Sequence, residues 1–197
     1  MAGVIDPECK RALGQMTKGV QVVAATHDGV TRAYTSHWVT QVAFEEPIVM
    51  ASMSPRHDTH PLVAAAGWFS VSILAGDQVE QGQYFSYPGR RFRHVASEYL
   101  TAVDGVPVVD GCIAWLRCET FERKPMFDHE LFFARVTHWG YGRLGADPLV
   151  YSARHGWRVA SERARERGVS VRDRLLGRLA AVSDGDDDAD DDGAGDA

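Results

Sequence analysis

The sequence lacks the features of membrane-spanning and secreted proteins. No uninterrupted apolar run in its 197 residues approaches the roughly 18–20 residues of a membrane span. Its first residues carry neither the apolar middle nor the small-residue cleavage site of a secretory signal. The three cysteines, Cys9, Cys112 and Cys118, are odd in number and form no C-x-x-C pair, which indicates a reducing compartment without a disulfide framework. We therefore expect a cytoplasmic protein that has no contact with membranes.

The charged residues are distributed unevenly along the chain. Residues 184–197 carry eight aspartates and no lysine or arginine, and removing them changes the net charge from −6 to +2. Such a segment cannot bury apolar surface, so we expect a disordered tail that either aids solubility or docks a basic partner. The remaining body is nearly neutral and gives no indication of a nucleic-acid surface.

Several common catalytic and nucleotide-binding motifs are missing. The chain has no G-x-x-x-x-G-K phosphate loop, no G-x-G-x-x-G after a strand and no G-x-S-x-G elbow. His57 and His60 form an H-x-x-H pair, but no carboxylate or thiolate pair completes a metal set, so we predict no metal site. His129 follows Asp128 and is either a structural residue or a base whose tautomer the carboxylate holds.

What the chain does contain is a series of β-rich runs joined by turn residues. Two such runs flank Asp28-Gly29, which is typical of a hairpin. Thr59, Pro61 and Gly67 have the spacing of an N-cap, a first-turn proline and a C-terminal stop, and they predict a helix. Apolar patterning predicts further strands over residues 47–53, 68–74, 112–123, 129–142 and 147–153.

Other segments are predicted to be helix or loop. Residues 7–17 begin with proline and have helical spacing, and Asp77 is placed to cap another short helix. Residues 87–105 have mixed signals, which we interpret as a loop with some helix. Cys112 and Cys118 have even spacing and would share one face of a strand. The Arg-rich residues 159–183 predict a terminal helix with four apolar residues at helical spacing: Val171, Leu175, Leu176 and Leu179.

The order of these elements favours a fold dominated by β-strands (β+α). Many strands follow one another at short spacing, and no regular βαβ alternation supports a doubly wound parallel sheet. An antiparallel barrel with helical insertions accommodates this order.

A polar cluster around Trp38 interrupts the strands between Thr31 and Met53. It is either an unusually polar loop or a segment shaped around something flat and polar. The helix start at Thr59 leaves backbone N–H groups that are either simply capped or able to hold an anion. A ligand with a flat hydrogen-bonding head and a phosphate tail, such as flavin mononucleotide (FMN), suits both features.

A succession of motifs resembles the flavin reductase-like, FMN-binding split-barrel proteins. The motifs are "MTKGVQVVAAT", "YTSHWVTQVAFEEPIVMASM", "THPLVAAAGWFSVSIL", "GRRF", "VPVVDGCIAWLRCE" and "FDHELFFARV", and the match covers residues 10–158 in the family's order. The form "WVTQVAFEEP" is more similar to the branch that contains flavoredoxin. The resemblance implies a split-barrel domain over residues 1–158, ahead of the Arg-rich helix (159–183) and the acidic tail (184–197).

The resemblance also implies which residues form the site. The positions that match the flavin-binding segments are Thr35, Ser36, His37, Trp38, Val39, Thr40, Gln41, Ser52, Ser54, Arg56, Thr59, His60, Phe85, Ser86, Arg91 and Phe92. The positions that match the nicotinamide side are Asp128, His129, Tyr151, Arg154 and Trp157, with His129 as the candidate catalytic residue. Four positions depart from the family: His37-Trp38 replace Asn-Ser, Phe127 replaces a glycine, and Trp157 replaces a tyrosine.

The function implied is an NAD(P)H-dependent flavin reductase that works as a homodimer. In such an enzyme the bound cofactor carries out the redox chemistry, and the protein needs no catalytic triad. The missing motifs therefore do not count against this hypothesis. Two alternatives stay open: an FMN-bound electron carrier reduced by a protein partner, and a non-catalytic module that binds a flavin or another phosphate-bearing ligand. The sequence also does not decide whether the hydride donor is NADH or NADPH, whether the flavin is FMN or FAD, or whether the partner is an electron acceptor or a monooxygenase.

Overall fold

The computed structural model describes residues 5–87, 96–161, 172, 175 and 176, and the chain divides into two units, 1–161 and 162–197. The first unit contains the helices α1 (Pro7–Leu13), α2 (Thr59–Ala66), α3 (Val79–Tyr84) and α4 (Ala96–Tyr99). Its strands are β1 (Lys18–Gly19), β2 (Gln21–His27), β3 (Val30–Ser36), β4 (Val39–Gln41), β5 (Ile48–Met53), β6 (Trp68–Ile73), β7 (Leu100–Val103), β8 (Val106–Val109), β9 (Ala114–Met126), β10 (His129–Tyr141), β11 (Leu149–Ser152) and β12 (Gly156–Val159).

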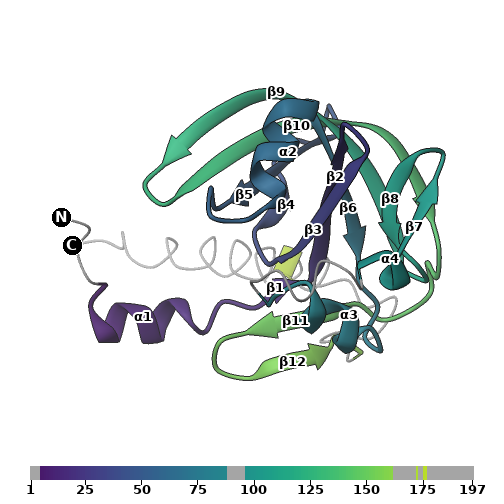
Figure 1. The fold of residues 1–197 in the computed structure, drawn as a ribbon. Helices are drawn as coiled ribbons and strands as arrows, with labels where there is room; N and C mark the ends of the chain where they lie inside the picture. Colours follow the sequence, from purple (N-terminus) through teal and green to yellow (C-terminus); the bar gives the residue numbers. More distant parts are fainter. Residues whose placement is uncertain (1–4, 88–95, 162–171, 173–174, 177–197) are drawn as a thin grey trace, which may run out of the picture. The chain divides into compact units, whose positions relative to one another are not determined.

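Seven strands form one curled antiparallel sheet (Figure 1). Their order is β3-β2-β6-β9-β10-β5-β4, so the two edge strands, β3 and β4, are joined by only two residues of chain, His37 and Trp38. A link this short brings the opposite edges of the sheet together, and the Tyr34 hydroxyl of β3 donates to the Ser52 carbonyl of β5 at 3.5 Å. The strand-dominated antiparallel split barrel predicted from the sequence is confirmed.

Two smaller sheets complete the first unit. β1, β11 and β12 form a three-stranded sheet, in which Lys18 pairs with Tyr151, and β7 and β8 form a hairpin. Among the described residues, no helix is long and apolar enough to cross a membrane.

The alternation of side chains along the strands builds two apolar clusters. One lies inside the curled sheet beneath α2 and contains Met53, Val63, Phe69 and Phe132, all fully buried. The other contains Val20, Leu74, Trp115 and Leu149, which connect the large sheet to the β1-β11-β12 sheet. Burying a large apolar side chain stabilises the fold by about 1.5–3 kcal/mol, so these clusters fix the strands that carry the polar segment around Trp38.

Several predicted elements are confirmed. Asp28 and Gly29 have φ angles of 48° and 73°, the paired positive values of a tight hairpin turn. The strand predicted over 68–74 is β6, and the helix predicted over 59–67 is α2, which ends at Gly67 with φ 72°. In α2 the N-cap position belongs to Asp58, so Thr59 is the first helical residue rather than the cap.

Other predicted elements were wrong in detail. Asp77 does not cap α3, because its carboxylate accepts two hydrogen bonds from the Arg143 guanidinium, at 2.6 and 2.7 Å. Cys112 precedes β9, so it does not share a strand face with Cys118, although both thiols are free and buried. The helix predicted over 7–17 ends at Leu13.

The remaining corrections concern strands. β9 continues to Met126, so the turn before β10 contains only Phe127 and Asp128. The segment 87–105, predicted as a loop with some helix, contains helix α4 in its described part but also strand β7, which was not predicted. Strand β12 follows the strand predicted over 147–153. Of the predicted terminal helix, residues 172, 175 and 176 are described and helical, whereas Val171, Leu179 and the acidic tail lie outside the described residues.

Candidate functional site

A cavity of about 190 Å³ lies where the two edges of the large sheet approach the β1-β11-β12 sheet. It is lined by Lys18, Tyr34, Thr35, Ser36, His37, Trp38, Ser52, His57, His129 and Tyr151. Seven of these ten were predicted site residues, drawn from segments far apart in the sequence. The curling of the sheet therefore brings the polar cluster around Trp38 together with the first residue of β10 and with β11.

Hydrogen bonds to the backbone shape the link between β3 and β4. The Ser36 hydroxyl accepts a hydrogen bond from the Trp38 amide at 3.1 Å, and the Ser52 amide donates to the Trp38 carbonyl at 2.9 Å. The Thr35 hydroxyl donates to the Gly82 carbonyl at 2.6 Å, which fastens β3 to α3. The polar side chains of this segment therefore hold the chain in a bend that leaves Trp38 at the cavity.

An aromatic group forms one wall of the cavity. The rings of His37 and Tyr151 are stacked, with centroids 4.5 Å apart and planes 13° apart, and Trp157 contacts His37 by its edge. Burial lowers the pKa of His37, and the charge of Lys18 lowers it further, so the ring is neutral at neutral pH. The Nδ1 atom of His37 is buried and has no hydrogen-bond partner among the described residues.

The opposite wall contains two further histidines. Trp38 contacts His129 edge to face at 4.8 Å, and Tyr34 stacks on His57 with centroids 4.7 Å apart. Burial lowers the pKa of His57, and the charge of His129 lowers it further. The Asp128 carboxylate lies 3.0 Å from Nδ1 of His129, and this hydrogen bond lowers the pKa of Asp128. A carboxylate only accepts, so Nδ1 of His129 donates and its Nε2 is left for other partners.

The other predicted flavin-binding residues that the structure describes are not among those that line the cavity. Val39, Thr40 and Gln41 form β4, and Phe85 and Ser86 follow α3. Ser54, Arg56, Thr59 and His60 form the loop and first turn of α2, where the Ser54 hydroxyl accepts a hydrogen bond from the Arg56 amide at 3.3 Å. Nε2 of His60 lies 2.7 Å from the Glu130 carboxylate. Arg91 and Phe92 lie outside the described residues.

The predicted nicotinamide-side residues are divided between two places. His129 and Tyr151 line the cavity, Asp128 holds His129, and Trp157 packs behind His37. Arg154 lines a different cavity, next to α1.

Three lining residues, Lys18, Tyr34 and His57, were not among the predicted flavin-binding or nicotinamide-side residues. Lys18 reaches the site only because β1 pairs with β11, a contact between segments more than a hundred residues apart. Tyr34 belongs to a strand whose sequence pattern gave no sign of a binding residue. Burial raises the pKa of its hydroxyl. His57 was considered as a donor of the loop before the helix start and as half of a metal pair, but not as a residue beside the flat ring. Among the described residues, no group of His, Cys, Asp and Glu could hold a metal ion.

The cavity fits part of a flavin. Pockets that enclose a whole small molecule measure about 300–1,000 Å³, so a space of about 190 Å³ accommodates a flat ring system and leaves its side chain outside. The lining agrees with such a ring, since the Lys18 ammonium is a donor for polar ring atoms, and Trp38 and Tyr151 supply aromatic faces. These residues define a split barrel with a pocket suited to a flavin ring.

Comparison with known proteins agrees with this class. The family model of the flavin reductase like domain matches residues 13–158, and the chain belongs to that family. Over 152 residues it is 30% identical to the NADH-dependent flavin reductase StyB of Pseudomonas fluorescens, covering 76% of this chain and 88% of that protein. It is 28% identical to the reductase component of the 4-nitrophenol 4-monooxygenase/4-nitrocatechol 2-monooxygenase of Rhodococcus opacus, covering 73% of this chain and 76% of that one.

A solved structure has the same fold. The styrene monooxygenase flavin reductase of Pseudomonas putida S12 superimposes with a TM-score of 0.71 and 26% identity, covering 79% of this chain and 99% of that one. The predictions of the family, of the fold and of an oxidoreductase of the flavin reductase type are confirmed.

Proposed function

We propose that the cavity around Trp38 holds the isoalloxazine ring of FMN or FAD, and that the protein transfers hydride to it from NADH. One observation carries the proposal: a single cavity collects the polar segment 35–38, Ser52, His129 and Tyr151 together with the cation of Lys18. The names of StyB and of other relatives support NADH as the donor.

Each lining residue has a role in this proposal. When bound, the flavin supplies N5 as the hydride acceptor. Lys18 places a positive charge at the edge of the cavity, where it favours electron density on the ring's polar edge. The neutral ring of His37, stacked on Tyr151, forms an aromatic wall beside the flavin, and the half-exposed Trp38 covers one ring face. The loop from Ser54 to Thr59 lies beyond Ser52 and receives the ribityl-phosphate.

The nicotinamide side is formed by His129. Its ring lies edge-on to Trp38, and Asp128 fixes its tautomer with the proton on Nδ1, so Nε2 is free to accept a hydrogen bond from the nicotinamide amide N–H. The residue therefore orients the donor ring, while the chemistry belongs to the two cofactors.

Purified protein mixed with flavin is expected to oxidise NADH in repeated turnovers. The measurement is absorbance under anaerobic conditions, first of the protein with FMN or FAD and then after NADH is added, with the same flavin without protein as the control. A yellow protein that NADH does not reduce would favour the electron carrier, and a colourless protein without flavin affinity would leave only the binding module for another ligand.

We also propose that the protein acts in the cytoplasm as a homodimer that supplies reduced flavin to a monooxygenase component. The names of the Rhodococcus opacus and Pseudomonas putida proteins support the monooxygenase partner. Self-association is supported by Phe127, whose side chain is fully exposed although its φ of 53° is a conformation that non-glycine residues adopt at a cost. Phe127 is separated by one residue from His129, which lines the cavity, so a subunit that covered Phe127 would lie close to the cavity.

Phe127→Gly is expected to stabilise the isolated subunit and weaken the dimer. Glycine adopts φ 53° freely, which gains about 1 kcal/mol in the free energy of unfolding, whereas loss of the phenyl ring removes an interface contact. Denaturant unfolding measures the first effect, and sedimentation over a range of concentrations measures the second. Phe44→Gly is the matched control, since Phe44 is equally exposed on a different turn. A dimer constant unchanged by Phe127→Gly would remove this residue from the interface.

A further inference from the structure

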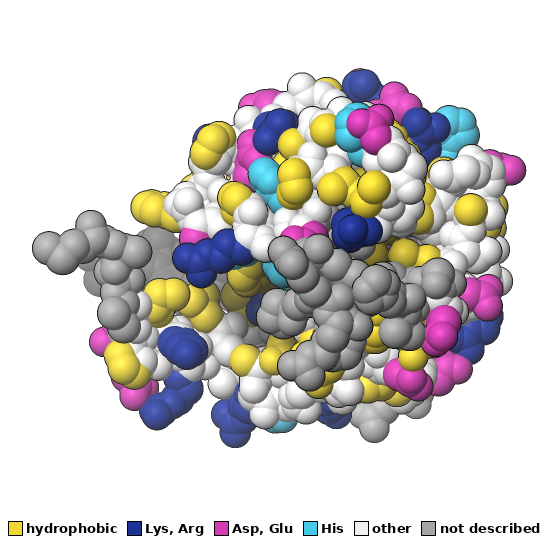
Figure 2. All heavy atoms as spheres, viewed as in Figure 1, with side chains coloured by type: hydrophobic (Ala, Val, Ile, Leu, Met, Phe, Trp, Pro, Cys, Tyr) yellow, Lys and Arg dark blue, Asp and Glu magenta, His cyan; other side chains and the backbone are white. Residues whose placement is uncertain are grey.

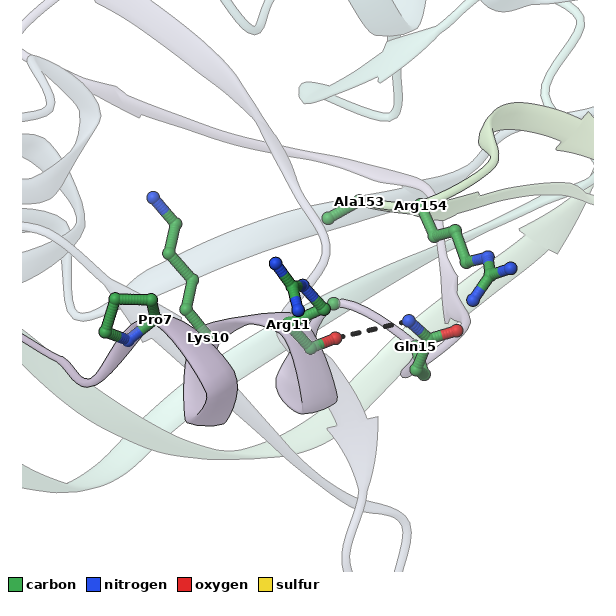
Figure 3. A pocket seen from close by; sticks show the side chains of 7 residues that line it. Pro7, Lys10, Arg11, Gln15, Ala153 and Arg154 are labelled. Carbon is green, nitrogen blue, oxygen red and sulfur yellow. Dashed lines mark hydrogen bonds between the residues drawn. The ribbon is translucent and has the colours of Figure 1, made fainter.

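A second cavity, of about 470 Å³, lies between α1 and the turn that joins β11 to β12 (Figure 3). It is lined by Pro7, Lys10, Arg11, Gly14, Gln15, Ala153 and Arg154. Its size lies within the range of small-molecule sites. The proposed flavin site does not use this cavity.

The lining of this α1 cavity is positively charged. Lys10, Arg11 and Arg154 all line it, and no carboxylate does. Arg11 is bound to Glu8 at 2.8 Å, whereas Lys10 and Arg154 have no ion pair within the part of the chain that the structure describes. On the face shown in Figure 2, Lys and Arg side chains gather over α1 and beside the β11–β12 hairpin. An anion is therefore the expected occupant.

Two segments of the chain connect the α1 cavity with the cavity around Trp38, which we call the flavin cavity. Lys18 and Tyr151 are paired residues that line the flavin cavity, while Gln15 and Arg154, each three residues away along the same two segments, line the α1 cavity. Gly14–Gln15 and Ala153–Arg154 are turns, so each of these steps of three residues is shorter than the roughly 10 Å of a fully extended chain. Close packing holds the two sides of the α1 cavity together, because a Cβ on Gly14 would lie 3.4 Å from that of Ala153.

We propose that the α1 cavity binds the pyrophosphate–adenosine half of a dinucleotide whose redox-active ring lies in the flavin cavity or against the ring bound there. Lys10 and Arg154 contact the phosphates, and Pro7, Ala153 and the stems of the long cationic side chains pack on the adenosine. The inference rests on the proposed function for the identity of the ring. Two dinucleotides, NADH and FAD, carry this group, and their chemistry at the α1 cavity is the same.

Adenosine diphosphate (ADP) is the direct probe, because it contains the proposed group and no redox ring. Calorimetric titration of the full-length protein is expected to show ADP binding, weakened about tenfold by Lys10→Ala and by Arg154→Ala, as for loss of one charged contact. Arg158→Ala is the matched control, since Arg158 is an exposed arginine on β12 that lines neither cavity. Absence of ADP binding, or equal binding by Lys10→Ala and the wild type, overturns the proposal.

Kinetics then separate the two sources of the group. If the adenosine belongs to NADH, Lys10→Ala raises the KM for NADH about tenfold. The KM for reduced nicotinamide mononucleotide, which has no adenosine, is then unchanged. If it belongs to FAD, the same substitution weakens FAD binding and leaves FMN binding unchanged. ADP binding without NADH oxidation would sink the reductase proposal and leave the α1 site standing, whereas NADH oxidation without ADP binding would do the reverse.

Discussion

Ser52→Phe is expected to abolish flavin binding and leave the protein folded. Side chains alternate along β5, so Ala51 and Met53 are fully buried in the core while Ser52 faces the flavin cavity. A phenyl ring at this position would occupy the space that the flat ring of a flavin requires. We expect Kd for FMN to rise at least 100-fold, equivalent to about 2.7 kcal/mol, as measured by quenching of flavin fluorescence.

The control for this variant is Thr101→Phe, which adds a similar ring at an exposed position of β7, away from the cavity. Thermal unfolding should show both variants folded, since neither position belongs to the core. If Ser52→Phe bound FMN as tightly as the wild type, the flavin ring would have to lie elsewhere, and the proposed role of the cavity would be lost.

The elements that could be predicted from the sequence are those whose signal is local. The hairpin at Asp28-Gly29, the helix that stops at Gly67 and the strand β6 each depend on residues within a few positions of one another. Asp104-Gly105 carries the same kind of turn signal, with φ angles of 50° and 77°, but the surrounding strands β7 and β8 are only four residues each and their pattern is too short to recognise.

Residues whose placement depends on distant contacts could not be predicted in this way. Asp77 has the spacing of a cap, yet Arg143, sixty-six residues later, engages its carboxylate. Lys18 is likewise brought to the cavity by the pairing of β1 with β11. Tertiary pairing overrides local preference at both positions, and a single sequence carries no signal for it.

The departures from the family pattern have a structural explanation. His37, where the family commonly has asparagine, stacks on Tyr151, meets Trp157 edge-on and forms a wall of the cavity. Trp38, next to it, contacts His129. Phe127 keeps the left-handed conformation that suits the family's glycine. His37 and Trp38 thus give the cavity aromatic side chains where the family commonly has small polar ones.

Glu130→Ala is expected to destabilise the protein by about 2 kcal/mol, because it breaks the link between α2 and β10. The Glu130 carboxylate, whose side chain is only 14% exposed, accepts hydrogen bonds from Arg123 at 2.8 and 3.1 Å and lies 2.7 Å from Nε2 of His60. Without this carboxylate, the charge of Arg123 loses its partner, and His60 loses the contact that ties the first turn of α2 to β10. Urea unfolding at neutral pH measures the effect.

The pH dependence of this loss identifies its cause. Hydrogen bonding from Arg123 lowers the pKa of Glu130 below its ordinary value of 4.5, burial opposes the shift, and His60 adds to it. A carboxyl with a lowered folded pKa stabilises the fold fully above 4.5 and loses that contribution as the pH falls through the folded value, so wild type and Glu130→Ala should converge in acid. Glu46→Ala is the control, because the Glu46–Arg135 pair is more than half exposed and its loss should cost less than about 1 kcal/mol. Equal losses in the two variants, or a difference that persists in acid, would show that the His60–Glu130–Arg123 cluster does not hold α2 against β10.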